Sequence, residues 1–210
     1  MKILKYSDII DKVRLKLDEI GINESEMMEA LEDNSNLDSV IESYIKQAYE
    51  YVMTNASLSL LDGKDGSTTS LAISDDLVAT VALPDDFMRL INIRLSSWKS
   101  SLSNLITEDS PEYRAQSNKW LCGNPEYPVV AMVHTKDGRK FELYKASSKD
   151  EKLSAFSYIP SFDESSESVS IPNELAEAFI CYIAALTLTT FKDEQANGFI
   201  SITNSILGIQ

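Results

Sequence analysis

The segment VALPDDFMRLINIRL, residues 81–95, joins two strand-like stretches through a proline followed by two acids. Two interpretations compete for Asp85 and Asp86: a carboxylate pair that binds a metal or catalyses a reaction, and a turn. Pro84 fixes its own φ and favours an extended residue before it, and acids at the start of a helical turn accept its free amides. A similar order of residue types recurs in IPNEL, residues 171–175, where it opens a helix. We therefore interpret the following as structural turn residues, with the phenylalanine as a core anchor: Pro84, Asp85, Asp86, Phe87 and Pro172.

The composition predicts a soluble globular protein. The chain has 210 residues, of which 43% are apolar, enough for one substantial core or two small ones. The longest apolar run, residues 175–188, contains Glu177 and is shorter than the roughly 20 residues that cross a bilayer, so we expect no membrane segment. The first 17 residues lack the features of a secretory signal, which predicts a protein made in the cytoplasm. Cys122 and Cys181 have neither zinc spacing nor a disulfide framework.

The net charge of −14 argues against tight, sequence-specific DNA binding, because such binding depends on counterion release by basic side chains. The charge is also uneven along the chain. Residues 1–60 carry 6 basic and 12 acidic side chains, residues 61–150 carry 11 and 13, and residues 151–210 carry 2 and 8. We therefore expect both ends to repel polyanions, whereas the middle can contact an acidic partner.

Apolar periodicity predicts helices at both ends of the chain. Residues 7–21 carry an apolar stripe that ends at a glycine, and residues 37–52 follow the 3.6-residue period with a polar opposite side. Residues 24–33 are acidic and predict a short helix or turn. A long helix begins at Pro172 and ends near residue 191, and residues 194–207 form another after the break at Lys192-Asp193-Glu194, although Asn197-Gly198 weakens that prediction.

Short extended segments between these helices predict an antiparallel sheet region. Residues 62–70 are a loop by composition, and Asp137-Gly138 is a strong hairpin signal. Ser110-Pro111-Glu112 has the order of a helix start, so residues 111–119 predict one inserted helix. The predicted strands are residues 71–73, 77–83, 88–98, 129–134, 140–146 and 152–158.

This order of elements predicts an α+β fold, with helices at both ends packed with a small antiparallel sheet region in the middle. We expect a single unit over residues 1–210. Its parts are a helical segment at residues 1–60, the sheet region with its inserted helix at residues 71–160, and a helical hairpin at residues 171–207.

The candidates for chemistry are few. His134 lies on a strand pattern without a second imidazole in the chain, which favours an ordinary sheet residue over a base or zinc ligand. Residues 62–67 resemble a calcium loop, but Lys64 stands where an oxygen ligand is needed. A metal-dependent nuclease would use Asp85 together with Asp150-Glu151-Lys152, although such acid pairs occur by chance in a chain that is 25% charged. We predict no catalytic residue, no metal ligand and no cofactor, and keep the nuclease as a minor alternative.

The order of motifs resembles the bacteriophage head-to-tail connector or adaptor family, which includes tail tubular protein A and the portal-attached rings of short-tailed phages. The resemblance covers residues 36–207. It consists of the paired amino-terminal helices, the LPDDFMRL turn, a Tyr-Arg helix after Ser110-Pro111, the ELYKA strand and the IPNEL helix, followed by a closing helix. Residues 22–35 and 161–170 have no clear counterpart.

The resemblance implies a structural virion protein at the head-tail junction. Such adaptors form a ring, usually dodecameric, on the portal protein; the ring extends the DNA channel, allows non-specific passage of genomic DNA and serves as a platform for downstream tail proteins. It also implies a portal or ring contact on the last helix, at Phe199, Ile200, Ile202, Ile206, Leu207 and Ile209. Two of these, Phe199 and Leu207, can instead close the subunit's own bundle. Residues 175–188 can likewise be subunit core or ring interface. The alternatives are another virion or tail-completion protein, or an acidic interaction module.

Overall fold

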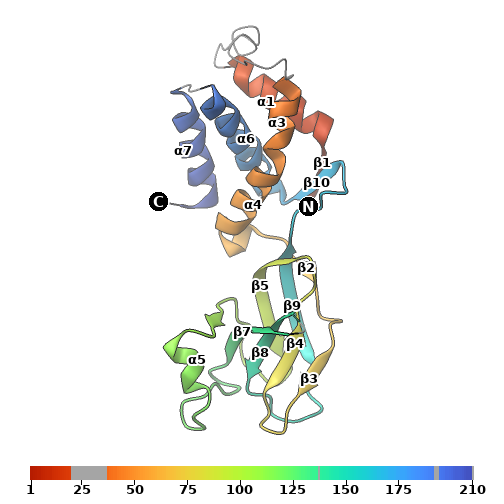
Figure 1. The fold of residues 1–210 in the computed structure, drawn as a ribbon, viewed down its shortest axis with the longest axis vertical. Coiled ribbons are helices and arrows are strands. Elements are labelled where there is room, and N and C mark those ends of the chain that lie inside the picture. The colour runs from red at the N-terminus through yellow and green to blue at the C-terminus, as the bar shows by residue number, and fades with distance from the viewer. Residues whose placement is uncertain (20–36, 137, 192–193, 210) are drawn as a thin grey trace. The chain divides into compact units, whose positions relative to one another are not determined.

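The computed structural model describes residues 1–19, 37–136, 138–191 and 194–209, and the chain divides into two compact units. The helical unit comprises Met1–Asp62 and Phe162–Gln210, so both ends of the chain build it. The sheet unit is the segment between them, Gly63–Ser161 (Figure 1). The predicted short helix or turn at residues 24–33, the hairpin residue Asp137 and the break at residues 192–193 lie outside the described residues.

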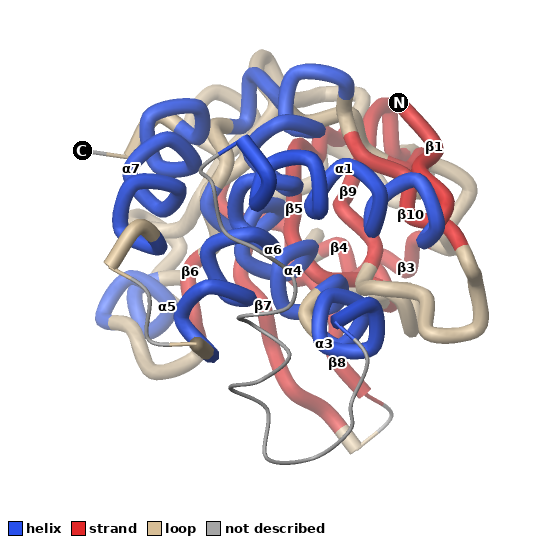
Figure 2. The backbone as a smooth tube through the Cα atoms, turned by 90° about the horizontal axis from the view of Figure 1, so that it is seen from above, coloured by secondary structure: helices blue, strands red, loops and turns tan. Residues whose placement is uncertain are grey.

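The helical unit is organised around one apolar helix. Helix α6 (Ala176–Thr190) packs against α1, α3, α4 and α7 (Figure 2). Nine of its residues are buried, as expected for a helix that is apolar almost all round. Residues 175–188, for which the sequence allowed either a subunit core or a ring interface, are therefore mainly part of the core. Among the described residues, the other helices of this unit are α1 (Tyr6–Glu19), α3 (Leu37–Ser43), α4 (Ile45–Asn55), α7 (Ala196–Leu207) and the short η1 (Leu58–Leu60) and η2 (Asn173–Leu175).

Two short strands tie the two ends of the chain together. Strand β1 (Lys2–Lys5) pairs antiparallel with β10 (Ser168–Ile171), from Lys2 opposite Ile171 to Lys5 opposite Ser168. Leu4, Val169 and Ile171 are buried, so this two-stranded sheet contributes its own apolar side chains to the unit. From Ile171 the chain passes through Pro172, whose carbonyl accepts a hydrogen bond from the N–H of Leu175, into η2 and α6.

The sheet unit contains two sheets. The first has the order β2-β9-β5 and the second the order β3-β4-β8-β7-β6, with β6 parallel to β7 and all other pairs antiparallel. The first sheet consists of β2 (Lys64–Asp65), β9 (Leu153–Pro160) and β5 (Phe87–Leu95). The second consists of β3 (Leu71–Ile73), β4 (Ala79–Ala82), β8 (Gly138–Tyr144), β7 (Val129–Thr135) and β6 (Ile106–Thr107), and helix α5 (Pro111–Ala115) follows β6.

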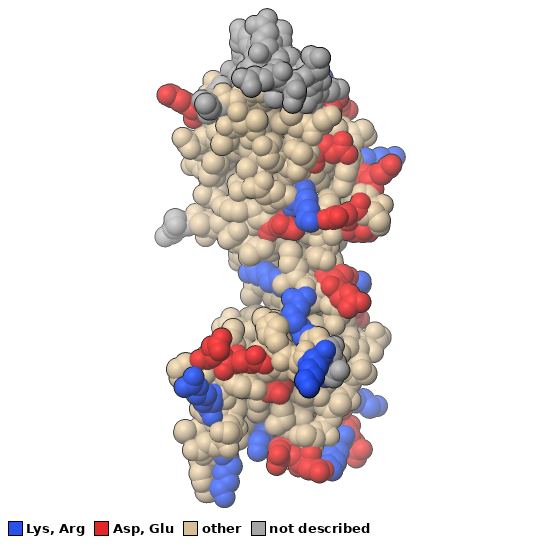
Figure 3. Space-filling model, viewed as in Figure 1, with Lys and Arg blue, Asp and Glu red and all other residues tan. Residues whose placement is uncertain are grey.

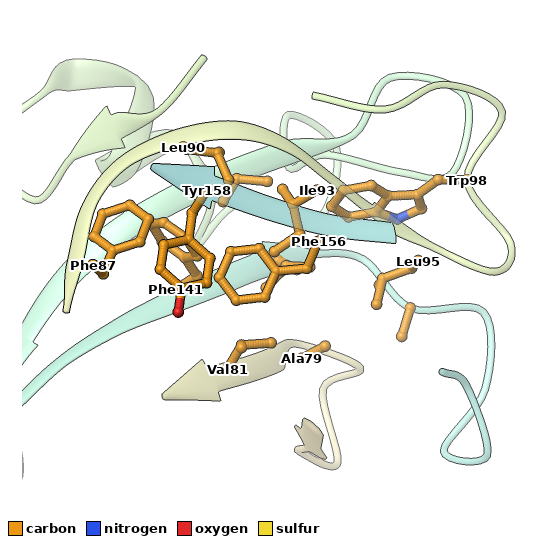
Figure 4. Close-up of a cluster of buried hydrophobic side chains, with 13 residues drawn as sticks. Ala79, Val81, Phe87, Leu90, Ile93, Leu95, Trp98, Phe141, Phe156 and Tyr158 are labelled. Carbon is orange, nitrogen blue, oxygen red and sulfur yellow. The ribbon is translucent and has the colours of Figure 1, made fainter. Parts of the chain in front are cut away.

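Aromatic side chains from both sheets form the core of this unit (Figure 4). Phe87 on β5 meets Phe141 on β8 edge to face, with ring centroids 5.3 Å apart. Phe141 also contacts Phe156 on β9, whose ring lies 5.5 Å from that of Tyr158. Rings contribute to stability both through buried area and through such edge contacts. Trp98 is 1% exposed in the same cluster, and its indole N–H donates to the carbonyl of Lys145.

The predicted fold class is wrong. Among the described residues the protein is a mixed α/β structure with ten strands in three sheets, and its helices do not flank one small antiparallel sheet. Helices from the two ends instead pack around α6, and the helical unit contains a sheet of its own. The six predicted strands correspond to β3, β4, β5, β7, β8 and β9, so the error lies in how elements associate. That residues 1–210 act as a single unit stays a prediction.

Gly66→Ala is expected to lower the free energy of unfolding of the sheet unit by about 1–3 kcal/mol, because overpacking forces neighbours to move. A Cβ at residue 66 would lie 2.6 Å from Cδ1 and 2.8 Å from Cε1 of the buried Phe156. The matched control is Gly198→Ala inside α7, where nothing lies within 4 Å of such a Cβ and alanine should stabilise by about 0.5–1 kcal/mol. Urea denaturation measures both. Unchanged stability of Gly66→Ala would contradict the close approach of residue 66 to β9.

Candidate functional site

The Pro84 turn forms a local polar network rather than a carboxylate pair. The N–H of Phe87 donates to the carbonyl of Pro84 at 3.0 Å, and β5 begins at once, without the predicted helical turn. Asp86 accepts from the Tyr158 hydroxyl at 2.9 Å and from Lys64 Nζ at 2.7 Å. Burial alone would raise the pKa of Asp86, but these two partners outweigh it and hold the pKa below its usual value. Asp86 therefore acts as a charged anchor between β2 and β9.

The carboxylates of the nuclease alternative lie at opposite ends of one strand pair. Phe87 is opposite Pro160, and Leu95 is opposite Leu153. Asp85 and the segment 150–152 are therefore separated by the length of β5, about 25 Å or more at the usual rise per residue. Glu151 is moreover engaged by backbone N–H groups of Ser97 and Ser147, at 2.5 and 2.6 Å. These residues cannot share one metal ion.

The described residues contain no group of three or more His, Cys, Asp and Glu side chains placed to hold a metal ion. His134 lies near the end of β7 and is 66% exposed, with Nδ1 3.9 Å from Oε2 of Glu108. Its backbone N–H donates to the same carboxylate at 2.7 Å. Nothing at this position provides a nucleophile or a second imidazole, so the geometry is that of a strand residue near an acid.

Two tyrosines share one carboxylate beside a hollow of about 640 Å³ in the sheet unit. Tyr113 of α5 and Tyr144 of β8 both donate to Oε2 of Glu142, at 3.1 and 2.6 Å. Burial, followed by the bond to Glu142, raises the pKa of Tyr144, and the same causes raise that of Tyr113. Both hydroxyls are thus neutral donors and not bases. The cluster holds α5 on the sheet, and it was missed because Tyr113 lies 29 residues before Glu142 in the sequence.

The six candidate contact residues in and after α7 divide between core and surface. Phe199 and Leu207 are 8% and 1% exposed, so they pack inside the helical unit. Ile202 is 47% exposed, and Ile200, Ile206 and Ile209 are half-buried. The helix ends at Gly208, which adopts a left-handed φ of 77°. The candidate surface is therefore narrower than the predicted strip.

A hollow of about 540 Å³, here called the α6–α7 groove, lies beside Ile202. Its rim carries a salt bridge between Lys16 Nζ and Glu177 Oε1, 3.0 Å long. Gly198 contributes no side chain to it, and a Cβ there would meet no atom within 4 Å. The groove is lined by Lys16, Glu177, Cys181, Gln195, Gly198, Phe199 and Ile202.

Helix α7 carries no charged side chain although it belongs to the more acidic unit. The helical unit contains 7 basic and 20 acidic residues, against 12 and 13 in the sheet unit. The exposed residues of α7 are small, amide or apolar: Asn197, Gly198, Ser201, Ile202 and Ser205. Figure 3 shows a broad area free of Lys, Arg, Asp and Glu over α7. The exposed face of α7 is thus uncharged within a unit of net charge −13.

The sheet unit exposes a different apolar surface, here called the 120–127 loop. Trp120, Leu121 and Tyr127 are 82%, 66% and 76% exposed. The loop was missed because the predicted helix ran to residue 119, whereas α5 ends at Ala115. The sequence feature that could have predicted this exposed loop is the Trp-Leu pair just before Cys-Gly-Asn-Pro. Lys119 Nζ lies 5.0 Å from the centre of the Trp120 ring.

Side-chain oxygens fix the shape of the 120–127 loop. Asn118 Oδ1 accepts from the N–H of Trp120, and Asn124 Oδ1 accepts from the N–H groups of Glu126 and Tyr127. The N–H of Gly123 donates to Oε1 of Gln116, which is 9% exposed. These bonds hold the backbone while leaving the three large side chains outside. Such a loop loses little conformational entropy when it binds.

Comparison with known proteins adds no family assignment. No protein-family model matches the chain, and no curated protein matches it at a significant level. Among the described residues, no helix is both long and apolar enough to cross a membrane.

Proposed function

We propose that the protein is a structural subunit of a phage head-to-tail adaptor ring. In this role it binds the portal protein, extends the DNA channel and provides the platform for downstream tail proteins at the head-tail junction. The observation that carries the proposal is the uncharged exposed face of α7 within a unit of 7 basic and 20 acidic residues. The protein acts here through surfaces and not through catalysis.

An uncharged face suits a permanent contact because the centre of a protein interface is depleted of Lys, Glu and Asp. Acid excess elsewhere keeps the subunit soluble before assembly and discourages other contacts. Ile202, 47% exposed, is the apolar residue on this face that a partner would cover. Gly198 and Ser201 let a partner's backbone approach closely, since they have little or no side chain.

A ring formed head to tail requires two different surfaces on every subunit. The chain has two: the uncharged face of α7 with the α6–α7 groove on the helical unit, and the 120–127 loop on the sheet unit. The net charge of −14 suits a channel protein, because DNA passes without forming the counterion-releasing contacts that would hold it.

An acidic interaction module that binds another protein is the second candidate. The 120–127 loop supports it, because exposed aromatic side chains on a fixed loop can dock on many kinds of partner. This candidate differs from the first in needing neither a ring nor a portal. No observation favours the nuclease, whose carboxylates lie at opposite ends of β5.

Ile202→Asp is expected to weaken assembly of the ring on the portal protein of the same genome at least about tenfold, because a charge would be desolvated where a neighbouring subunit covers the α7 face. The matched control is Ser43→Asp, which adds the same charge at an exposed position on α3, outside the uncharged face of α7. Mass photometry of mixtures measures the bound fraction, and negative-stain images show whether a discrete ring sits on the portal.

The control also separates position from charge. Equal weakening by both variants would indicate a general effect of added negative charge and would leave Ile202 without a special role. If the wild-type protein forms no complex with the portal over a range of salt and protein concentrations, the adaptor proposal is wrong. The interaction module then becomes the leading function.

A further inference from the structure

We propose that Trp120 and Leu121 of one subunit insert into the α6–α7 groove of a second copy, forming the head-to-tail contact of the assembly. The inference rests on the proposed ring function and names the two surfaces that meet. It follows from a protruding apolar pair on one unit, a hollow of matching chemistry on the other, and the charges of the two units.

The protruding side is preformed. Trp120 and Leu121 are 82% and 66% exposed, although backbone N–H groups that donate to the side-chain oxygens of Asn118 and Gln116 fix the loop. A soluble subunit gains nothing by holding a tryptophan in water, whereas Trp is enriched among residues that dominate binding energies. Lys119 lies over the Trp120 ring and forms no salt bridge with any described residue, so a basic group accompanies the aromatic one.

The receiving side is a hollow of about 540 Å³, larger than a tryptophan side chain. Phe199 and Ile202 provide apolar walls, and Gly198 leaves space that a side chain would fill. Glu177 at the rim is 57% exposed and can face Lys119 while keeping its bond to Lys16. Two protruding loops cannot bury each other in this way, which argues against contact between two 120–127 loops.

Net charge disfavours the other symmetrical arrangement, which is contact between two helical units. The net charges are −13 for the helical unit and −1 for the sheet unit. Repulsion between two net charges scales with their product. This product is 13 times larger for two helical units than for a helical unit and a sheet unit. Like-charge juxtaposition suppresses wrong pairings. A sheet-unit loop in a helical-unit groove is thus the pairing that satisfies both shape and charge.

The expected contact is small. A tryptophan buries about 150–250 Å², so Trp120 together with the smaller Leu121 supplies at most roughly half of the about 800 Å² per partner in a standard interface. Single contacts should therefore be weak, and stable assembly should require closure of the ring or the portal as a template.

Disulfide trapping tests the contact directly. One full-length variant carries Leu121→Cys and another carries Gly198→Cys, both with Cys122→Ser and Cys181→Ala to remove the native thiols. A disulfide forms only when the two Cα atoms approach within about 4.4–6.8 Å. The control replaces Gly198→Cys by Ser43→Cys, an exposed site on α3 that lines no part of the groove. The mixtures are oxidised with and without portal protein.

We expect the Leu121→Cys and Gly198→Cys pair to give a mixed dimer in about tenfold higher yield than the control pair, because docking raises the effective concentration of the two thiols. Trp120→Ala added to the Leu121→Cys variant should remove this excess, and Trp120→Phe should keep most of it. Equal yields for the two pairs, or a dominant Leu121→Cys dimer formed by two loops, would overturn the inference.

The portal arm separates this inference from the proposed function. A ring on the portal without the mixed disulfide means that the adaptor proposal holds and this contact is wrong. The mixed disulfide without portal binding means that the self-contact is real and the adaptor proposal is wrong. Absence of both overturns both.

Discussion

Glu151→Ala is expected to lower the free energy of unfolding of the sheet unit by about 3 kcal/mol. The Glu151 carboxylate is 9% exposed and accepts from the backbone N–H groups of Ser97 and Ser147, at 2.5 and 2.6 Å, and from Ser96 Oγ at 3.3 Å. Its removal leaves two backbone donors without this acceptor, and each buried unsatisfied group costs about 1–3 kcal/mol. One side chain thus holds the chain after β5 to the chain after β8.

The chain offers a matched control at the same place. Ser97 Oγ is buried without a hydrogen-bond partner among the described residues, while the N–H of Ser97 is the group that binds Glu151. Ser97→Ala should therefore leave stability unchanged or raise it by up to about 1 kcal/mol. Both tryptophans of the chain lie in the sheet unit, and Trp98 is buried, so urea unfolding followed by tryptophan fluorescence reports on this unit. A Glu151→Ala curve that overlays the wild type would contradict the prediction.

The same carboxylate gives a pH dependence with a definite sign. Burial alone would raise the pKa of Glu151, but the hydrogen bonds from Ser97, Ser147 and Ser96 outweigh it and lower the pKa. Because the folded pKa is the lower one, the contribution is fully present above the unfolded value of about 4.3 and is lost as pH falls through the folded value. The stability difference between wild type and Glu151→Gln should therefore shrink below about pH 4.

Local rules predict the backbone of the Pro84 turn but not the role of its acids. Proline fixes its own φ and favours an extended conformation of the residue before it, so both conformations can be predicted from the sequence. The partners of Asp86, in contrast, are Lys64 and Tyr158, 22 and 72 residues away. The same limit applies to the fold class. Periodicity located α6, β5 and β9, but the pairing of β1 with β10 joins Lys2 to Ile171, and neither strand is long or apolar enough to be found locally.

The candidate surfaces show a similar division. The candidate residues in and after α7 follow from the family resemblance, and neither the resemblance nor helical periodicity tells that Phe199 faces inward while Ile202, three residues later, stands at the rim. Trp120 was missed for a different reason. The predicted helix start at Ser110 is correct, because Ser110 Oγ accepts a hydrogen bond from the N–H of Tyr113. The end of the helix at Ala115, in contrast, has no proline or glycine to mark it.

Leu207→Asp is expected to lower the free energy of unfolding of the helical unit by at least about 4 kcal/mol, the largest effect among the α7 substitutions considered. Leu207 is 1% exposed in the last turn of α7. Truncating a buried leucine to alanine already costs about 2–5 kcal/mol, and an unpaired buried carboxylate costs several more unless it becomes protonated. Leu207→Met is the control, because volume-conserving apolar changes cost less than about 1.5 kcal/mol. Circular dichroism at 222 nm during urea unfolding measures both.

This variant and Ile202→Asp lie only five residues apart and should fail in different ways. Leu207→Asp should lose portal association together with helical signal, because the groove disappears when α7 leaves the core. Ile202→Asp should lose association at wild-type stability, since 47% of its side chain is already in water. A stable Leu207→Asp protein that no longer binds would mean that Leu207 faces the partner and that the packing of α7 against α6 is wrong. A destabilised Ile202→Asp protein would mean that the exposed face of α7 is core, and the surface on which the adaptor proposal depends would not exist.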